Sequence, residues 1–300
     1  MVTSIEIFER YEEIRPRLPA AKFPSRCQSI DNLGAIADEI DVFLLDAFGV
    51  LNVGERVIPG AVDRLEMLAE LGKQIFVLTN GATYDSGQAC QKYLKFGFDL
   101  KPHQVISSRD AALSALKNFP GRFNWGVAAT EYSGIEELPL ETRLLADDPR
   151  PYAEVDGFLF LSSADWTDHR QRLLTEALRH RPRPFIIGNP DLVAPREEGL
   201  SLEPGYFAHA IADETGSEPA FYGKPFEDVF DCALGAADLA GVDRSRIAMV
   251  GDTLHTDILG GAAAGLRTVL VTGHGLFKGI DTSGLIKRSG IVPDFIAAST

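Results

Sequence analysis

The sequence predicts an α/β protein with a parallel sheet at its core and a second α/β domain inserted into the first. Short continuous apolar runs alternate with segments of helical periodicity near the N-terminus, and the same alternation returns near the C-terminus. Between them lies a stretch with its own strand signals and frequent prolines. A length of 300 residues and an apolar content of 45% allow two domains with sizeable cores.

The first half of the core begins with a continuous apolar strand at residues 42–45. Apolar residues then repeat at helical spacing over residues 61–69, and Gly72 can end that helix. Residues 74–78 again form an apolar run. This order of elements is a βαβ unit, whose strands are parallel.

Further elements of the core follow in the same order. A second helix is expected over residues 85–96 and a third strand over 104–107. Near the C-terminus, strands are expected at 247–250 and 268–271, joined by a helix that ends before Gly265. Because these apolar runs are continuous rather than alternating, we expect helices on both faces of the sheet.

The middle of the chain predicts a separate set of elements. Strands are expected at 125–129, 157–161 and 185–187, and helices near 134–137 and 166–179. A loop at the rim of a parallel sheet can accept such a long excursion while the core re-forms beyond it.

These signals divide the chain into four segments. Residues 1–30 are expected to be an N-terminal helical extension, and 31–108 together with 205–300 the core domain. Residues 109–204 are expected to be the inserted domain. The sequence does not assign a chemical role to the N-terminal extension.

Charge and composition exclude several function classes. The 29 basic and 43 acidic residues give a net charge of −14, which repels nucleic acid and anionic lipid surfaces. The most apolar stretch, residues 42–51, contains Asp46 and is too short to span a membrane, and the N-terminus lacks the pattern of a secretory signal. We therefore expect a soluble, cytoplasmic protein with no nucleic-acid or membrane partner. Its three cysteines are too widely spaced for a zinc knuckle or a disulfide framework.

Polar residues follow the predicted core strands at the points where those strands end. Asp46 comes after the first strand, Thr79-Asn80-Gly81 after the second, and Asp252 and Asp257 after the strand at 247–250. Lys224 precedes a helix that begins near Phe226. The carboxyl ends of parallel strands meet at one edge of a sheet, so these groups are expected to share a crevice.

Their chemistry fits phosphoryl transfer. The carboxylate of Asp46 can attack phosphorus and form an acyl phosphate. Asp252 and Asp257 are hard oxygen ligands that can hold Mg²⁺, which would reduce the repulsion between nucleophile and phosphate.

The remaining groups can donate hydrogen bonds to the oxygens of the phosphoryl group that is transferred. Thr79 supplies a hydroxyl, Asn80 an amide and Lys224 a full positive charge. Taken one at a time, each of these groups is more often a helix cap, a turn residue or an exposed side chain. Their joint order and placement favour the functional interpretation.

The same residues resemble the haloacid dehalogenase (HAD) superfamily, which consists mainly of Mg²⁺-dependent phosphatases on a Rossmann-like core. Asp46 matches the nucleophile of its first motif, Thr79 the second motif, Lys224 the third, and Asp252 with Asp257 the fourth. The resemblance covers roughly residues 40–275.

The long insertion is similar to the class IIA cap of NagD-like and p-nitrophenyl phosphatase-like members. Segments 78–80, 189–191, 222–225 and 250–259 carry this likeness. The resemblance implies a phosphate and substrate site made of Thr79, Asn80, Gly81, Lys224, Asn189 and Asp191. It also implies a Mg²⁺ site made of Asp46, the Phe48 backbone carbonyl, Asp252 and Asp257.

Phe48 departs from the family pattern. Phosphatases of the superfamily carry a second aspartate here, which protonates the leaving group and activates water, and a phenyl ring cannot move a proton. General acid–base help is typically worth ~10² to 10⁴ in rate. His255, Glu55 and Asp191 are the candidates to replace it, and His255 is the nearest in sequence to the fourth motif.

Three functions remain open at this point. The first is a Mg²⁺-dependent phosphatase acting on a small phosphorylated metabolite with an atypical general acid. The second is a non-catalytic phosphate-ligand sensor with the same fold. The third is a 2-haloacid dehalogenase, in which an aromatic residue also occupies the position of Phe48, but those enzymes lack both the metal and a long α/β cap. A homodimer through the cap is the one assembly we consider.

Overall fold

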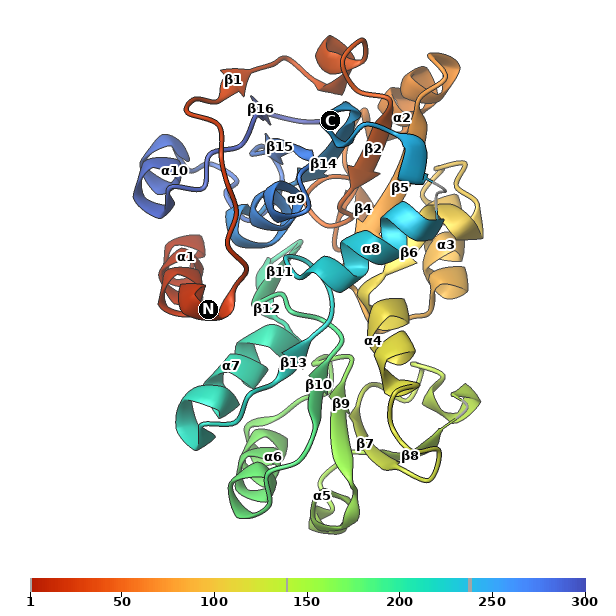
Figure 1. Ribbon diagram of the computed structural model, residues 1–300, viewed down its shortest axis with the longest axis vertical. Coiled ribbons are helices and arrows are strands. Elements are labelled where there is room, and N and C mark those ends of the chain that lie inside the picture. The colour runs from red at the N-terminus through yellow and green to blue at the C-terminus, as the bar shows by residue number, and fades with distance from the viewer. Residues whose placement is uncertain (1, 139, 237–238) are drawn as a thin grey trace.

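Two parallel sheets lie one above the other and organise the chain (Figure 1). The computed structural model describes residues 2–138, 140–236 and 239–300. The larger sheet has the order β1 (Gln28–Ser29), β16 (Phe295–Ala297), β15 (Arg267–Val271), β14 (Ile247–Gly251), β2 (Val42–Leu45), β5 (Gln74–Thr79), β6 (Val105–Ser107). The smaller sheet has the order β13 (Ala220–Phe221), β10 (Phe185–Ile187), β9 (Gly157–Phe160), β7 (Asn124–Ala128), β8 (Glu141–Leu144). The α/β fold class predicted from the sequence is confirmed.

Helices and two small hairpins complete the architecture. The helices are α1 (Ser4–Glu13), α2 (Ala61–Glu70), α3 (Ser86–Lys95), α4 (Ser108–Leu116), α5 (Pro149–Glu154), α6 (Asp168–His180), α7 (Pro204–Thr215), α8 (Glu227–Ala236), α9 (Leu259–Ala263) and α10 (Ser283–Ser289). The hairpins pair β3 (Asn52–Val53) with β4 (Arg56–Val57) and β11 (Val193–Arg196) with β12 (Gly199–Leu202). Residues predicted as a helix near 134–137 form a short 3₁₀ turn at Ile135–Glu137.

Helices cover both faces of the larger sheet, as the continuous apolar strands predict. On one face α2 and α3 pack against the strands, with Leu68 and Tyr93 in the same apolar cluster as Phe43. On the other face Phe230 of α8 packs in a cluster with Leu44. Successive residues of β2 therefore point to opposite faces and are all buried.

The smaller sheet reaches beyond the predicted limits of the inserted domain. Its edge strand β13 ends at Phe221, whereas the sequence placed the boundary at residue 204. Helix α7 also belongs here, because Ala208 and Ile211 pack with Phe160 in the core of this unit. The cap sheet thus extends about 17 residues past the expected boundary, because a two-residue edge strand has no periodic signature in sequence.

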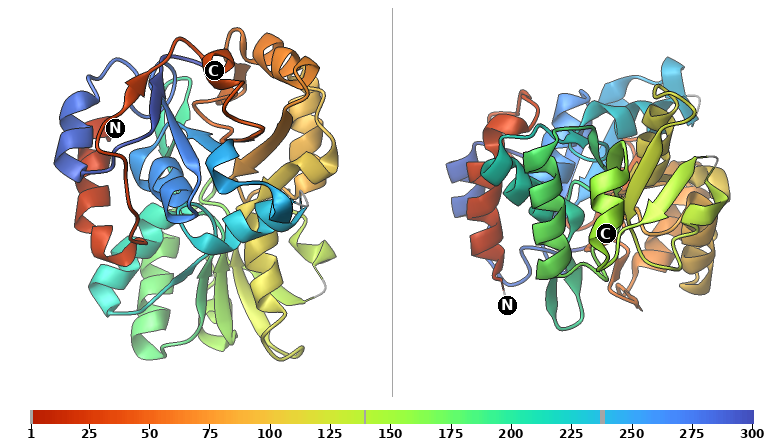
Figure 2. Two further views of the ribbon diagram at one scale, coloured as in Figure 1. Left: turned by 45° about the horizontal axis from the view of Figure 1, so that its top comes forward. Right: turned by 90° about the horizontal axis from the view of Figure 1, so that it is seen from below.

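The N-terminal segment is more than a free extension. Helix α1 lies beside the junction of the two sheets and close to α7 and α10 (Figures 1 and 2). Its apolar side, Ile7, Phe8 and Tyr11, packs in one cluster with Leu254 and Ile258 of the loop after β14. Strand β1 then adds to the edge of the larger sheet.

None of the helices in the described ranges combines the length and apolarity that a membrane span requires.

Candidate active site

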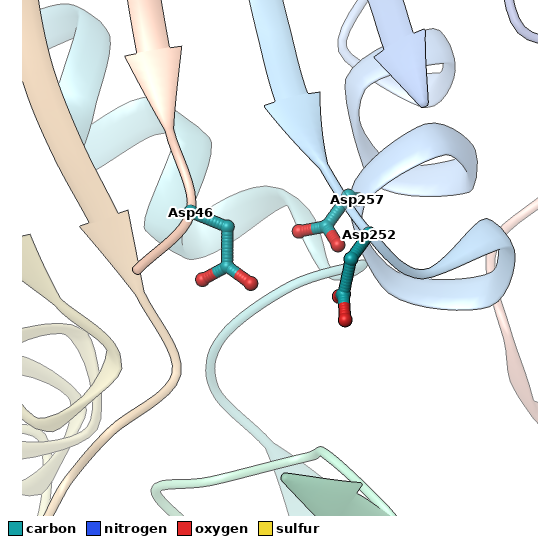
Figure 3. A group of neighbouring side chains, drawn as sticks. All are labelled: Asp46, Asp252 and Asp257. Atoms are coloured by element: carbon teal, nitrogen blue, oxygen red, sulfur yellow. The ribbon is translucent and has the colours of Figure 1, made fainter. Parts of the chain in front are cut away.

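Three aspartates converge at the carboxyl end of the larger sheet. Asp46 follows β2, Asp252 follows the neighbouring strand β14, and Asp257 lies in the helical turn Leu254–Ile258 that comes next (Figure 3). Each offers a carboxylate oxygen, and these three oxygens lie within 4.8 Å of one another. The backbone N–H of Asp46 donates to the Val250 carbonyl (2.8 Å), which joins the two strand ends at this point.

Lys224 lies among these acids and is almost completely buried. Its Nζ is 2.6 Å from Asp46 Oδ1 and 2.7 Å from Asp257 Oδ1, with 1% of its side chain exposed. Burial alone would lower the pKa of Lys224, but the carboxylates of Asp257, Asp46 and Asp191 raise it above its usual range. The lysine is therefore a fixed positive charge at the centre of the acids.

One lysine does not balance three carboxylates. Burial raises the pKa of Asp46 to about 7, with Lys224 acting against the shift and Asp257 adding to it. Burial, Asp257 and Asp46 raise the pKa of Asp252 to about 8. A compact set of carboxylate oxygens with excess negative charge is the donor set that a hard divalent cation prefers. The described residues therefore fit the Mg²⁺ site expected from the sequence.

Glycines give the acids room. Gly49 has φ +82°, and a Cβ on it would lie 2.4 Å from Asp252 Oδ2. A Cβ on Gly275 would lie 1.8 Å from the same oxygen. The next residue, Leu276, donates its backbone N–H to Asp252 Oδ2 (2.6 Å), so the loop after β15 helps to orient this carboxylate.

We expect the metal-free protein to lose stability as pH rises from about 4 to about 8. Folding raises the pKa of Asp46 and of Asp252, so the folded chain holds these protons more tightly than the unfolded chain. That contribution is complete below the ordinary aspartate pKa and is lost as pH passes through the folded values of about 7 and about 8. Mg²⁺ should offset the loss, because the cation replaces the protons.

Thermal unfolding at pH 6 and pH 8.5, in EDTA and in Mg²⁺, measures this effect. The control is the Asp46→Asn/Asp252→Asn double variant, which keeps the shape of both side chains and should lose most of the pH dependence. A wild type equally stable at both pH values in EDTA, or indifferent to Mg²⁺, would contradict the expectation.

Asn80 is a positioning residue. Its Oδ1 accepts the Lys224 backbone N–H (2.7 Å), while its Nδ2 donates to the Lys224 carbonyl (2.9 Å) and to Asp191 Oδ1 (2.8 Å). These bonds occupy the polar atoms of the side chain. In this structure Asn80 therefore holds Lys224 and Asp191 in place, and the phosphate-binding role expected for its amide stays a prediction.

Thr79 and Gly81 lie where the sequence predicts. Both line a small hollow of about 20 Å³ together with Asp46, Asp191 and Asp252. Thr79 is buried, and its Oγ1 accepts the Gly81 backbone N–H (3.1 Å). A hydroxyl donor therefore faces the acids across the hollow.

Asn189 does not line this hollow. Its Oδ1 accepts the Asp191 backbone N–H (3.0 Å) and its Nδ2 donates to Glu203 Oε2 (3.1 Å). The amide therefore fixes the loop that carries Asp191, and the substrate contact expected for Asn189 stays a prediction.

Phe48 also lines the hollow, and two cations lie over its ring. Arg196, from the cap hairpin β11–β12, lies 4.7 Å from the ring centroid, and Lys92 Nζ lies 5.3 Å from it. The ring therefore provides a contact between core and cap.

Two of the three candidates for the missing acid are wrong. His255 is fully buried, stacks on Tyr11 and bonds Glu12 Oε1 through Nε2 (2.5 Å), and burial lowers its pKa to about 4. Glu55 pairs with Lys92 and is largely exposed. Only Asp191 enters the hollow, where burial, first of all, raises its pKa well above the usual range.

Sequence reasoning missed three contributors to the site. Gly275 and Leu276 shape and orient Asp252, and the only hint in the sequence is a glycine pair after the strand at 268–271. Tyr11 OH accepts the Leu192 backbone N–H (3.1 Å), so helix α1 contacts the cap loop next to Asp191. No sequence signal connects Tyr11 with that loop.

Two family models match the chain. Residues 43–136 match a model described as haloacid dehalogenase-like hydrolase, and residues 221–299 match one described as HAD-hydrolase-like. The two segments contain Asp46, Lys224, Asp252 and Asp257, whereas Asp191 lies between them.

Relatives and solved structures agree with these matches. Phosphoglycolate phosphatase 1A of Arabidopsis thaliana is 28% identical over 289 residues, covering 89% of this chain and 77% of that protein. An acid sugar phosphatase of Staphylococcus aureus is 27% identical over 254 residues, covering 84% and 92%. A possible sugar phosphatase of the HAD superfamily from Cytophaga hutchinsonii has a similar structure, with a TM-score of 0.80, 26% identity and coverage of 91% and 98%.

Proposed function

Because the chain is a hydrolase of the haloacid dehalogenase superfamily, similar to its NagD-like and p-nitrophenyl phosphatase-like members, we propose that it uses Mg²⁺ to hydrolyse the phosphate monoester of a small metabolite. The observation that carries this proposal is the buried group of Lys224 with Asp46, Asp252 and Asp257. The phosphatase relatives support the same class of substrate.

Asp46 is the nucleophile of the proposed reaction. Lys224 contacts one of its oxygens, Oδ1, and holds the carboxylate at the carboxyl end of β2. A carboxylate oxygen attacks phosphorus, the bond from phosphorus to the ester oxygen breaks, and an aspartyl phosphate forms. Water then hydrolyses this acyl phosphate and restores Asp46.

The surrounding residues stabilise charge. Bound Mg²⁺, held by Asp46, the Phe48 carbonyl, Asp252 and Asp257, would offset the repulsion between carboxylate and phosphate. Lys224 supplies a full positive charge and Thr79 a hydroxyl donor toward the transferring oxygens. The hollow of about 20 Å³ is too small for an ester, so cap and core must separate to admit one.

Asp191 is the group best placed to exchange a proton with the leaving group. It shares the hollow with Asp46 and the Phe48 ring, and Asn80 donates to one of its oxygens. Burial raises its pKa well above the usual range, which favours the protonated form that a general acid needs. A carboxyl from the cap thus takes the role that Phe48 cannot fill.

Phe48 favours one competing function, in which the site binds phosphate without turnover. Release of inorganic phosphate decides between the two. We expect the purified protein to release phosphate from p-nitrophenyl phosphate in Mg²⁺, to stop in EDTA, and to recover when Mg²⁺ is restored in excess. Binding of phosphate without release would favour the sensor, and halide release from 2-chloropropionate would favour a dehalogenase. A cytoplasmic location and a homodimer through the cap stay predictions.

A further inference from the structure

A second, larger hollow adjoins the acids. It has a volume of about 530 Å³ and is lined by the β3–β4 hairpin, the β11–β12 hairpin of the cap and the loop after β15. Pro195 and Leu276 line both this hollow and the small one that contains Asp46. Because Leu276 also bonds Asp252, the wall between the two hollows is part of the acid site.

The charge of this hollow is opposite to that of the whole chain. Acidic residues outnumber basic ones by 43 to 29 overall, yet the hollow is lined by Arg56, Arg196 and Lys278 and by one acid, Glu197. His274 is a further N–H donor in its lining. We call this set the basic hollow.

Two cations of the basic hollow, Arg56 and Lys278, can pair with a ligand, whereas Arg196 already pairs with Glu203. Within the described ranges, neither Arg56 nor Lys278 forms an ion pair, and both are exposed. Arg196 donates through Nε to Ser201 and through Nη2 to Glu203, while its Nη1 has no partner among the described residues. Its guanidinium rests on the Phe48 ring, which holds it between the two hollows.

The remaining lining is apolar. Val53, Val57, Ile58 and Leu200 contribute to it. A pocket of this kind suits a carbon skeleton that ends in a negative charge. An anionic end could pair with Arg56 or Lys278, whereas a neutral sugar or polyol could not.

We propose that the basic hollow binds a second anionic group, a carboxylate or a phosphate, on the leaving group of the substrate. This inference rests on the proposed phosphatase function, since it places the ester phosphate at Asp46. The substrate class is then a phosphorylated sugar acid or a bisphosphate, whose two charged ends occupy the two hollows.

Matched ligands test the charge directly. The first pair is 6-phosphogluconate and sorbitol 6-phosphate, which differ by one carboxylate, and the second is glucose 1,6-bisphosphate and glucose 6-phosphate. Dissociation constants are measured calorimetrically in Mg²⁺ with the Asp46→Asn variant, which cannot turn the ligands over. In at least one pair, we expect the ligand with an anionic group at both ends to bind about tenfold more tightly than its partner at low ionic strength. The pair with the larger ratio of dissociation constants shows whether the hollow prefers a carboxylate or a phosphate as the second anionic group.

Variants of the hollow locate the effect. Arg56→Gln together with Lys278→Gln should bring the ratio close to one, whereas Glu197→Gln should increase it about threefold because it removes the only acid in the lining. The matched control is Lys101→Gln, since Lys101 lines a different hollow of about 560 Å³. Both substituted cations are exposed, so the fold should tolerate their loss.

The outcomes separate this inference from the proposed function. Equal binding of both members of each pair, or a ratio that survives Arg56→Gln/Lys278→Gln, would overturn the basic hollow as an anion site even if the wild type hydrolyses neutral esters. A clear ratio in a wild type that releases no phosphate from any ester would instead overturn the phosphatase and leave the anion site standing.

Discussion

The Asp46→Asn variant is expected to lose about 10³-fold or more of the phosphatase activity. The asparagine amide has the shape of the carboxylate, and its Oδ1 can still accept a hydrogen bond from the Lys224 ammonium. It does not attack phosphorus. Because the substitution also removes one of three clustered negative charges, the metal-free variant should be at least as stable as the wild type. A loss of rate without a loss of stability identifies a chemical role.

The measurement has two parts. Steady-state phosphate release gives the rate, and rapid acid quench with a phosphate-labelled ester shows whether label becomes attached to the protein. We expect labelled wild type, unlabelled Asp46→Asn, and unchanged behaviour in Asp38→Asn, a control at an exposed aspartate. Label on the Asp46→Asn protein would remove Asp46 as the nucleophile.

Most of the fold could be predicted because buried parallel strands are continuous apolar runs. Strand β2 has the predicted bounds, and β5 and β14 each extend one residue further. The strands β1 and β13 could not be predicted, since two residues carry no period. The three-residue strand β16 was missed as well, although β6 and β10, of the same length, were predicted. The pairing of β1, β13 and β16 depends on segments far away in the chain, and that is why the end of the cap was misplaced.

The acids and the lysine could be predicted from their positions at strand ends, because topology alone brings those ends together. The roles of amide and histidine side chains could not. Asn80, Asn189 and His255 all have suitable chemistry, but each is already engaged by a partner from another part of the fold: Lys224, Glu203 and Glu12.

The N-terminal segment had no expected role for the same reason. Its amphipathic pattern predicts a helix but not the surface that the helix covers. In the structure Glu12 bonds His255 of the core, while Arg10 of the same helix pairs with Asp213 of the cap. Helix α1 therefore links both units beside the acid loop.

Exchanging the proton donor between two positions is expected to change which esters are cleaved. Asp191→Asn retains an acceptor for Asn80 Nδ2 but cannot donate a proton as a carboxyl does, so hydrolysis of alkyl phosphates should fall about 10²-fold. Cleavage of p-nitrophenyl phosphate should fall much less, since its leaving group departs without protonation. Phe48→Asp in the same background should restore at least tenfold of the alkyl rate, because it returns a carboxyl to the position where family phosphatases carry one. The ratio of aryl to alkyl kcat/KM measures both changes.

The surroundings of Phe48 make this substitution practicable. The ring is only partly buried, and Lys92 and Arg196 lie over it, so an added carboxyl would find charged partners instead of an apolar core. Phe48→Asn in the Asp191→Asn background is the matched control, since it removes the same ring and adds no acid. If Asp191→Asn lowers aryl and alkyl rates equally, Asp191 orients Asn80 and Lys224 and transfers no proton. If the control restores the alkyl rate as well as Phe48→Asp does, the recovery comes from the space left by the ring, and the proton reaches the leaving group from water.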